Sequence, residues 1–178
     1  MKVGNEKILG GLGGIFLFLL FVPGIGTLLG LAGYVLFLIA MYNISKVYND
    51  QKIFNWSLMG VILSTLGFIV ALFFGLLSGA ASFGLLGALS GSNSMESTSV
   101  FGASLGVGTI LAIIIGIALF IYAYFLMYKA LRKVAEYTQI SLFKLSGQLL
   151  FIGSILIFIF IGVFLILIGW LLVGISFF

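Results

Sequence analysis

The stretch FLFLLFVPGIGTLLGLAG, residues 16–33, decides the fold of this chain, because it places a Pro-Gly pair inside a run that carries no charge. Two interpretations are open. One continuous, kinked helix would put the start of the chain across a membrane from residue 46. A turn between two helices would instead return the chain to the side on which it started. Proline suits the first turn of a helix and glycine suits the turn itself, which favours the second interpretation.

The composition around this stretch is that of a membrane protein. Of the 178 residues, 63% are hydrophobic and 7% are charged, and the mean hydropathy is +1.39. Ordinary soluble domains carry roughly 25% charged residues. Because so few charges cannot solvate the outside of so apolar a chain, we place residues 1–178 in lipid as a single integral membrane domain.

Apolar runs along the chain predict an all-α fold, a polytopic transmembrane helix bundle with five hydrophobic segments. A spanning helix needs about 20 residues, so the first run is short and either spans or is re-entrant. It also fits a cleavable signal peptide behind Lys2 and Lys7, although the early Glu6 is atypical of one. The segments cover residues 8–22, 27–42, 56–77, 105–128 and 149–177.

The distribution of charge sets the predicted orientation. With the Pro-Gly pair as a turn, all eight basic residues fall on one side of the membrane, which the positive-inside rule assigns to the cytoplasm. The loop at 78–104, with Glu96 as its lone charge, then falls on the other side. We therefore expect a multi-pass protein of the cell membrane with a cytoplasmic N-terminus and an extracytoplasmic C-terminus.

An internal similarity predicts a parallel duplication of a helical hairpin. GIGT at 24–27 precedes MYNISKV at 41–47, and GVGT at 106–109 precedes MYKALRKV at 127–134. The candidate repeat units are residues 24–77 and 106–177, related by an axis along the membrane normal. In each unit the glycines would make a turn and Thr27 or Thr109 would cap the helix, while the alternative is an anion site at the helix N-terminus.

Glycine is frequent, with 25 residues, and recurs at spacings of four or seven that place small residues on one helix face. Such faces let helix backbones approach closely in lipid. Packing inside one chain and packing against another copy or another protein both stay open. The candidate packing residues are Gly10, Gly14, Gly26, Gly30, Gly60, Gly67, Gly75 and Gly79.

A basic helix face follows the fourth run. Lys129, Arg132, Lys133 and Glu136 recur at helical spacing in MYKALRKVAEYTQ. The face is either simply solvated, or its three cations contact anionic lipid headgroups. The net charge of +4 is spread over several cytoplasmic segments, so membrane lipid is an expected partner and nucleic acid is not.

The residue types that are missing limit the chemistry. The chain has no cysteine and no histidine, and none of its four acidic residues lies inside an apolar run. Thiolate metal sites are thereby excluded, and the commonest metal ligand, the usual haem ligand and the usual proton shuttle are missing. We expect no catalytic residue, no metal and no cofactor, and hence no enzyme.

Short motifs near the N-terminus suggest a family. GGLGG, the VPGIG turn, the pattern IS.VY.D and IFNWSL, between residues 9 and 63, resemble the multi-spanning membrane proteins grouped as domain of unknown function 996. These proteins occur mainly in archaea and in some bacteria. The resemblance implies a prokaryotic integral membrane protein and brings no functional residue to carry over.

Two functions remain open at this point. The first is a non-enzymatic membrane subunit or scaffold that packs through glycine-rich helix faces, as a homo-oligomer or in a membrane protein complex. The alternative is a small channel or transporter for an uncharged or apolar solute. Its cavity would be lined by the few polar groups at depth, which are Thr27, Ser64, Thr65, Thr109, Gln148 and Ser154.

Overall fold

The computed structural model describes residues 5–22, 25–67, 69–70 and 95–178, and their regular structure is entirely helical, with no strand. The all-α prediction therefore holds for this part of the chain. The chain divides into two compact units. The first comprises residues 1–62 and 121–178, and the second comprises residues 63–120.

Six helices carry the described structure. The helix at 51–67 and α4 each contribute to both units. Two 3-10 segments, η1 and η2, follow α1 and α5. The bounds are α1 Asn5–Phe18, η1 Leu19–Phe21, α2 Gly26–Val47, α4 Met95–Thr138, α5 Ser141–Ile155, η2 Leu156–Ile159 and α6 Ile161–Phe177.

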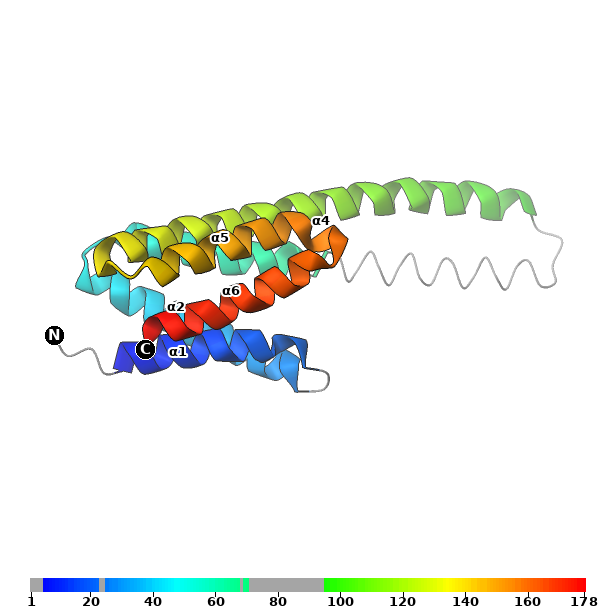
Figure 1. Cartoon of the computed structure of the whole chain (residues 1–178). Helices are drawn as coiled ribbons and strands as arrows, with labels where there is room; N and C mark the ends of the chain where they lie inside the picture. The colour runs from blue at the N-terminus through cyan, green and yellow to red at the C-terminus, as the bar shows by residue number, and fades with distance from the viewer. Residues whose placement is uncertain (1–4, 23–24, 68, 71–94) are drawn as a thin grey trace. The chain divides into compact units, whose positions relative to one another are not determined.

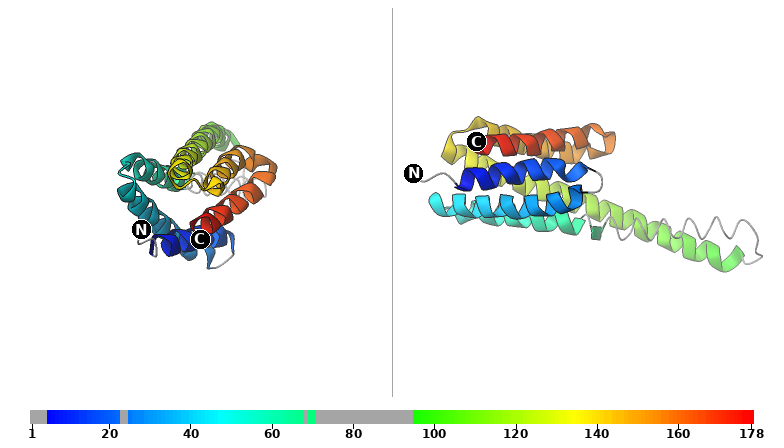
Figure 2. Two further views of the ribbon diagram at one scale, coloured as in Figure 1. Left: turned by 60° about the vertical axis from the view of Figure 1, so that its left-hand side comes forward. Right: turned by 90° about the horizontal axis from the view of Figure 1, so that it is seen from below.

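In the first unit each helix packs antiparallel against the next, and α6 returns to α1, so that the helices form a closed ring (Figure 1, Figure 2). Glycines occupy most of these contacts, where a side chain would meet the neighbouring helix. The contacts, in order round the ring, are Gly33 with Leu17, Tyr42 with Phe54, Gly60 with Met127, Gly147 with Tyr128, Gly153 with Ile166, and Gly14 with Gly174.

Aromatic side chains fill the centre of this ring. Trp170 of α6 is only 1% exposed and meets the rings of Phe37 and Tyr34 edge-on, at centroid distances of 5.4 and 6.0 Å. Tyr124 of α4 is buried too and interacts with Tyr34 and Trp170. Helices distant in sequence are thus joined by one aromatic cluster.

The chain reverses direction between Phe21 and Gly26. Leu20, the middle residue of η1, packs on Gly26 and Gly30 at the start of α2, and α1 and α2 lie antiparallel. The backbone N–H of Gly26 donates to the carbonyl of Val22 at 2.9 Å, which closes the turn. The structure therefore agrees with a turn and not with a kinked helix, although Pro23 and Gly24 themselves lie outside the described residues.

The fifth apolar run differs from the expectation of one helix over 149–177. α5 ends at Ile155, and Phe160 has a φ of 59° before α6 begins. The chain folds back because Gly153 and Gly162 let α5 and α6 touch, with room for no more than hydrogen atoms between them. A Cβ on Gly153 would lie 2.9 Å from the carbonyl oxygen of Gly162.

This fold-back moves the C-terminus to the opposite end from the one expected. Phe177 lies against Gly10, and Phe178 lies against Gly11, both in the first half of α1. Because α1 begins at that same end, the start of α1 and the end of α6 lie together (Figure 1). The prediction of termini on opposite sides assumed one crossing where the structure has two helices.

Two expectations about loops and caps also need correction. α4 begins at Met95, so residues 95–104 of the expected 78–104 loop are helical, while residues 78–94 lie outside the described part. The GVGT motif at 106–109 therefore lies inside α4 and not at a helix start. At the first copy, Ile25 holds the N-cap position of α2 without a side-chain hydrogen bond, so Thr27 is not the cap.

The repeat is consequently not reproduced at its GxGT motifs, since only the first one stands at a helix start.

Two of the described helices are long and apolar enough to cross a membrane, namely Leu28–Val47 and Ile113–Thr138. The other apolar helices are shorter and comprise Lys7–Phe18, Ser141–Ile155 and Ile161–Phe177. In the second unit, Gly67 packs on α4. A Cβ added to Gly67 would lie 3.3 Å from the carbonyl oxygen of Gly116.

Candidate functional site

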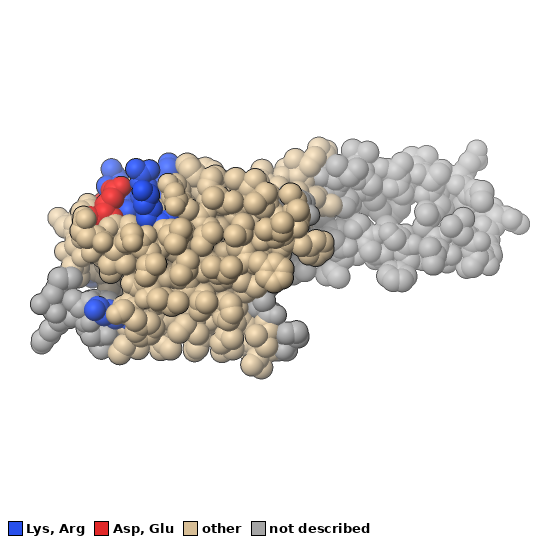
Figure 3. Space-filling model, in the orientation of Figure 1, with Lys and Arg blue, Asp and Glu red and all other residues tan. Residues whose placement is uncertain are grey.

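Charged side chains gather at one end of the first unit, and the other described residues on the face shown in Figure 3 are uncharged. This basic end, as we call it, also holds the end of α6. It is built from helix ends and the turns between them, where the backbone leaves the apolar part of the ring. Its cationic residues are Lys7, Lys46, Lys52, Lys129, Arg132, Lys133 and Lys144.

Asp50, in the turn after α2, organises one side of the basic end. Its carboxylate lies 3.6 Å from the Lys133 ammonium and accepts hydrogen bonds from the Tyr137 hydroxyl at 3.1 Å and the Lys52 backbone N–H at 3.0 Å. Tyr137 in turn stacks on Tyr48 at 4.9 Å. These contacts tie the last turns of α4 to the turn at 48–50.

The same contacts explain the acidity of Asp50. Partial burial raises the pKa of its carboxyl, but the hydrogen bonds from Lys52 and Tyr137 and the charge of Lys133 together outweigh burial and hold the pKa below the usual value of 3.8. Asp50 therefore stays ionised at neutral pH. The charge of Lys133 is largely neutralised by it, since the Asp50 side chain is only 15% exposed.

Lys129 is engaged in a different way. Its ammonium lies 4.6 Å from the ring centre of Phe125 and 5.8 Å from that of Trp56. A cation over an aromatic face gains roughly 0.5–1 kcal/mol at an exposed site. Lys46 lies over Tyr42 in the same manner, at 4.4 Å. Trp and Tyr side chains are enriched where lipid tails meet the headgroups of a bilayer.

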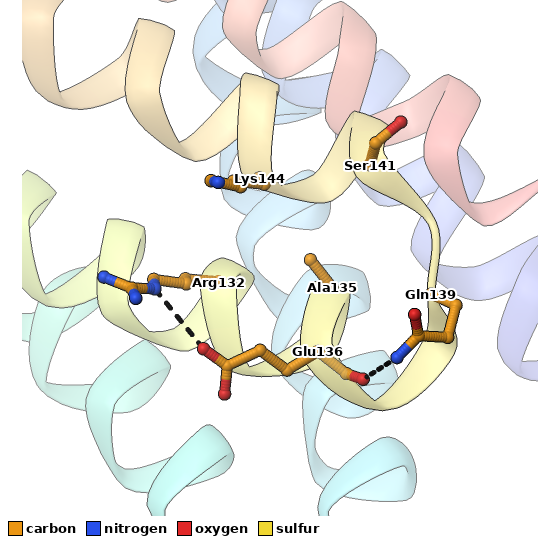
Figure 4. Close-up of a pocket in the computed structure, with 6 residues that line it drawn as sticks. All are labelled: Arg132, Ala135, Glu136, Gln139, Ser141 and Lys144. Carbon is orange, nitrogen blue, oxygen red and sulfur yellow. Dashed lines mark hydrogen bonds and ion pairs between the residues drawn. The ribbon is translucent and has the colours of Figure 1, made fainter.

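An open hollow of about 350 Å³ lies beside the α4–α5 turn (Figure 4). Gln139, with a φ of 61°, makes the turn, and its side-chain amide donates to the carbonyl of Glu136 at 2.7 Å. Arg132 pairs with Glu136 at 3.3 Å, four residues along the same helix. The hollow is lined by Arg132, Ala135, Glu136, Gln139, Ser141 and Lys144.

The structure separates the three cations that were expected to act together on lipid headgroups. Lys133 faces Asp50, Lys129 faces aromatic rings, and only Arg132 lines the hollow. Lys144 lines it too and was not singled out, because it lies on the next helix and only the turn at 139–140 brings it close. A basic residue just after a predicted helix turn was the signal that could have found it.

Most of the candidate packing glycines lie at contacts inside the chain. Gly10 and Gly14 meet α6, Gly26 and Gly30 meet Leu20, and Gly60 and Gly67 meet α4, while Gly75 and Gly79 lie outside the described residues. Gly13, Gly153 and Gly174 make equally close contacts that the spacing pattern did not indicate.

The candidate cavity residues do not share one surface within the first unit. Ser154 is buried and donates to the carbonyl of Phe151 at 2.7 Å, whereas Gln148 is exposed. In the second unit Ser64 is buried and Thr65 is exposed. The side chains of Thr27 and Thr109 lie outside the described part.

Buried serines elsewhere bond to their own helix in the same way. Each donates its hydroxyl to a carbonyl three or four residues earlier, so it packs as a small residue. The donors are Ser45, Ser57, Ser146 and Ser176. Among the residues the structure describes, no cluster of three carboxylates or other ligating side chains could hold a metal ion.

Comparison with known proteins identifies the family. The family model described as "Protein of unknown function (DUF996)" matches residues 29–171. This chain belongs to the DUF996 family. The DUF996 chain is also 32% identical over 183 residues to "Uncharacterized protein MJ1644" of Methanocaldococcus jannaschii, covering 100% of this chain and 93% of the relative. No solved structure matches it. The match confirms the resemblance predicted from the motifs between residues 9 and 63.

Proposed function

We propose that this DUF996 protein is a multi-pass membrane protein with a structural role, a non-enzymatic subunit or scaffold in the lipid bilayer. The observation that carries the membrane assignment is an uninterrupted apolar outer face. On α2 the exposed side chains of Leu28, Leu31, Val35 and Ile39 follow one another at helical spacing, with Leu28 at 73% exposure. Soluble monomers rarely leave such faces bare.

Exposed apolar side chains also line α6, the last helix of the chain. Phe164, Ile168 and Ile175 are exposed, and no charged residue occurs anywhere in the helix. Among the described side chains of the first unit, charge is confined to the basic end, as it is in proteins whose helices stand across a bilayer with their ends at the headgroups. On this proposal the shorter helices α1, α5 and α6 cross the bilayer as well, and the basic end faces the cytoplasm.

The way glycine is used refines the scaffold proposal. The described glycines serve contacts inside the chain, so a partner would not meet them. The surface left for a partner is the exposed Leu, Ile, Val and Phe face, which lipid would otherwise cover. Association in the membrane through such a face depends on shape and van der Waals contact.

The alternative role, a channel or transporter, has less support in the geometry. The ring of the first unit is centred on Trp170, Phe37 and Tyr124, all almost fully buried. A solute path would require these rings to move apart. Five buried serines already donate their hydroxyls to carbonyls of their own helices, namely Ser45, Ser57, Ser146, Ser154 and Ser176.

Two experiments test the proposal. Membranes that contain the protein are extracted with alkaline carbonate, and the protein is expected to stay in the pellet; release into the supernatant would overturn the membrane assignment. The protein is then purified in mild detergent and weighed by native mass spectrometry. A stable oligomer or a co-purifying membrane protein supports a subunit role, whereas a lone chain that carries solute flux in liposomes contradicts it.

Leu31→Arg, which puts a charge on the outward face of α2, is expected to abolish retention in the pellet or to cause degradation, since a cation at the centre of a helix costs about 2.5–3.5 kcal/mol on insertion. Lys46→Arg is the matched control on the same helix and is expected to behave as the wild type.

A further inference from the structure

The hollow at the α4–α5 turn is lined by two cationic side chains and one carboxylate. Arg132 and Lys144 come from different helices, and Figure 4 shows their charged ends on the same side of the hollow. Glu136 is the acidic member and lies 3.3 Å from Nε of Arg132. The hollow therefore has a surplus of one positive charge.

Both cations retain donors for a ligand. A guanidinium has five N–H donors in a planar fork, and the contact with Glu136 is made through Nε, which leaves the two terminal nitrogens. Lys144 is exposed and forms no ion pair with any carboxylate in the described part of the chain. In this it differs from Lys133, which Asp50 holds.

The backbone adds to the positive potential. α5 starts at Ser141, which lines the hollow, and its N-cap residue Ile140 supplies no side-chain hydrogen bond. The first N–H groups of a helix lack partners within that helix and carry its positive dipole end. An anion in the hollow would meet this end together with the two side chains.

An apolar track leads away from the hollow along α5. Leu145 follows Lys144 directly, and Ile152 and Ile155 are exposed further along the helix, beyond the exposed Gln148. A ligand with a charged head and hydrocarbon tails would match both parts. A soluble phosphate would use only the first.

We propose that this hollow binds the phosphate headgroup of an anionic phospholipid, with its acyl chains along Leu145, Ile152 and Ile155. The proposal rests on the membrane position given under the proposed function. Arg132 and Lys144 hold the phosphate oxygens, while Lys129 and Lys133 take no part because aromatic rings and Asp50 already engage them.

The test measures lipid binding by the whole protein in detergent. Native mass spectrometry counts bound phosphatidylglycerol and bound phosphatidylcholine as each lipid is titrated. The wild type is expected to retain phosphatidylglycerol preferentially. Arg132→Gln with Lys144→Gln is expected to weaken this binding by up to about 25-fold, at about fivefold for each cation.

A matched control removes the same charge from the same end. Lys46→Gln with Lys52→Gln lies outside the hollow and is expected to change phosphatidylglycerol binding by less than about twofold. An equal loss in both double variants would overturn the proposal, because it would reduce the effect to the general charge of the surface. Melting curves of both variants show that each is folded.

Glu136→Gln provides a test of opposite sign. It removes the negative charge from the hollow and releases Arg132, so phosphatidylglycerol binding is expected to tighten severalfold. Damage to the fold would not produce a gain. Unchanged or weaker binding in this variant would contradict the assignment of the site.

Competition distinguishes a lipid from a soluble anion. Glycerol phosphate, which has the head without the tails, is expected to displace phosphatidylglycerol only at concentrations at least about 100-fold higher. Displacement at equal concentration would overturn the assignment to a lipid. None of these results depends on the carbonate extraction, so failure of this site and failure of the membrane assignment are separate outcomes.

Discussion

Two turns at the end of the first unit opposite the basic end reverse the chain by different means. Between α1 and α2 the sequence carries a Pro-Gly pair, and the helices on either side stop and restart around it. Between α5 and α6 the sequence is LIFIFIG, with no proline, and the reversal falls on Phe160 at a φ of 59°. The second turn therefore depends on the packing of α5 against α6 and not on a turn-forming residue pair.

The comparison shows that the length of an apolar run does not give the number of helices in it. Residues 149–177 form one run by hydropathy and two antiparallel parts in space. Gly153 and Gly162 allow the close contact that makes the fold-back favourable, and the strained residue at 160 is tolerated because the packing on both sides fixes it.

The largest expected effect comes from filling the space at this second turn. A Cβ on Gly162 would overlap the carbonyl oxygen of Gly153 and the backbone of Leu156 and Ile157. Gly162→Ala is therefore expected to lower the free energy of unfolding by about 1–3 kcal/mol. Unfolding in detergent, followed by circular dichroism, measures the change.

Gly116→Ala is the control, because its new Cβ would have Gly67 O as its nearest neighbour at 3.7 Å, an ordinary contact. It is expected to be neutral or to stabilise by up to about 1 kcal/mol through higher helix propensity. Equal losses at both glycines would mean that the α5–α6 contact does not hold the turn.

The next effect has the opposite sign. Phe160 is 81% exposed, and a left-handed backbone costs an L-residue roughly 1–2 kcal/mol. Phe160→Gly is expected to raise the free energy of unfolding by about 1 kcal/mol, since glycine adopts this conformation freely. Phe160→Val, which is β-branched, is expected to lower it. A lower stability of the glycine variant would exclude strain at this turn.

The turn after α2, at the basic end, is held by the charge of Asp50. Because the pKa of Asp50 is lower in the folded protein than its usual value of 3.8, its contacts stabilise fully above that value and are lost as pH falls through the folded pKa. Asp50→Asn is expected to cost at most about 1 kcal/mol at pH 7. The difference from the wild type should shrink as the pH falls below 3.8 and vanish once the carboxyl is protonated in the folded protein as well, as measured by unfolding at a series of pH values. A difference independent of pH would contradict the role of its charge.

The smallest effect on stability is expected at Ser154, near the end of α5. Ser154 bonds to the carbonyl of Phe151 in its own helix, so Ser154→Ala is expected to change stability by no more than about 0.5 kcal/mol and to leave any solute flux into liposomes unaltered. Ser154→Leu, which overfills the same buried position, should lose about 1–3 kcal/mol. A selective loss of flux in the alanine variant would favour the transporter alternative.

The sequence predicted the features that depend on local chemistry. The apolar composition indicates the helical class, the Pro-Gly pair marks the first reversal, and the short motifs identify the family. These signals reside in a few neighbouring residues or in the average of the chain.

Features that depend on distant contacts could not be obtained in this way. No proline lies near Phe160, and a single glycine such as Gly162 is tolerated inside a helix, so the second reversal is visible only once Gly153 and Gly162 are seen to touch. Lys144 joins Arg132 only because the turn at 139–140 places two helix ends together. GVGT resembles a helix start, yet the residues before it continue α4.

The central claim is that the chain reverses twice at the end opposite the basic end, so that the C-terminus returns beside α1. The chain has no cysteine, so single cysteines can be placed without background at Ile25, Gln51, Ile159 and Phe178 and labelled with an impermeant maleimide in vesicles of known orientation. We expect positions 51 and 178 to react from one side and positions 25 and 159 from the other. Reaction of 51 and 178 from opposite sides would contradict the fold-back and the grouping of both chain ends.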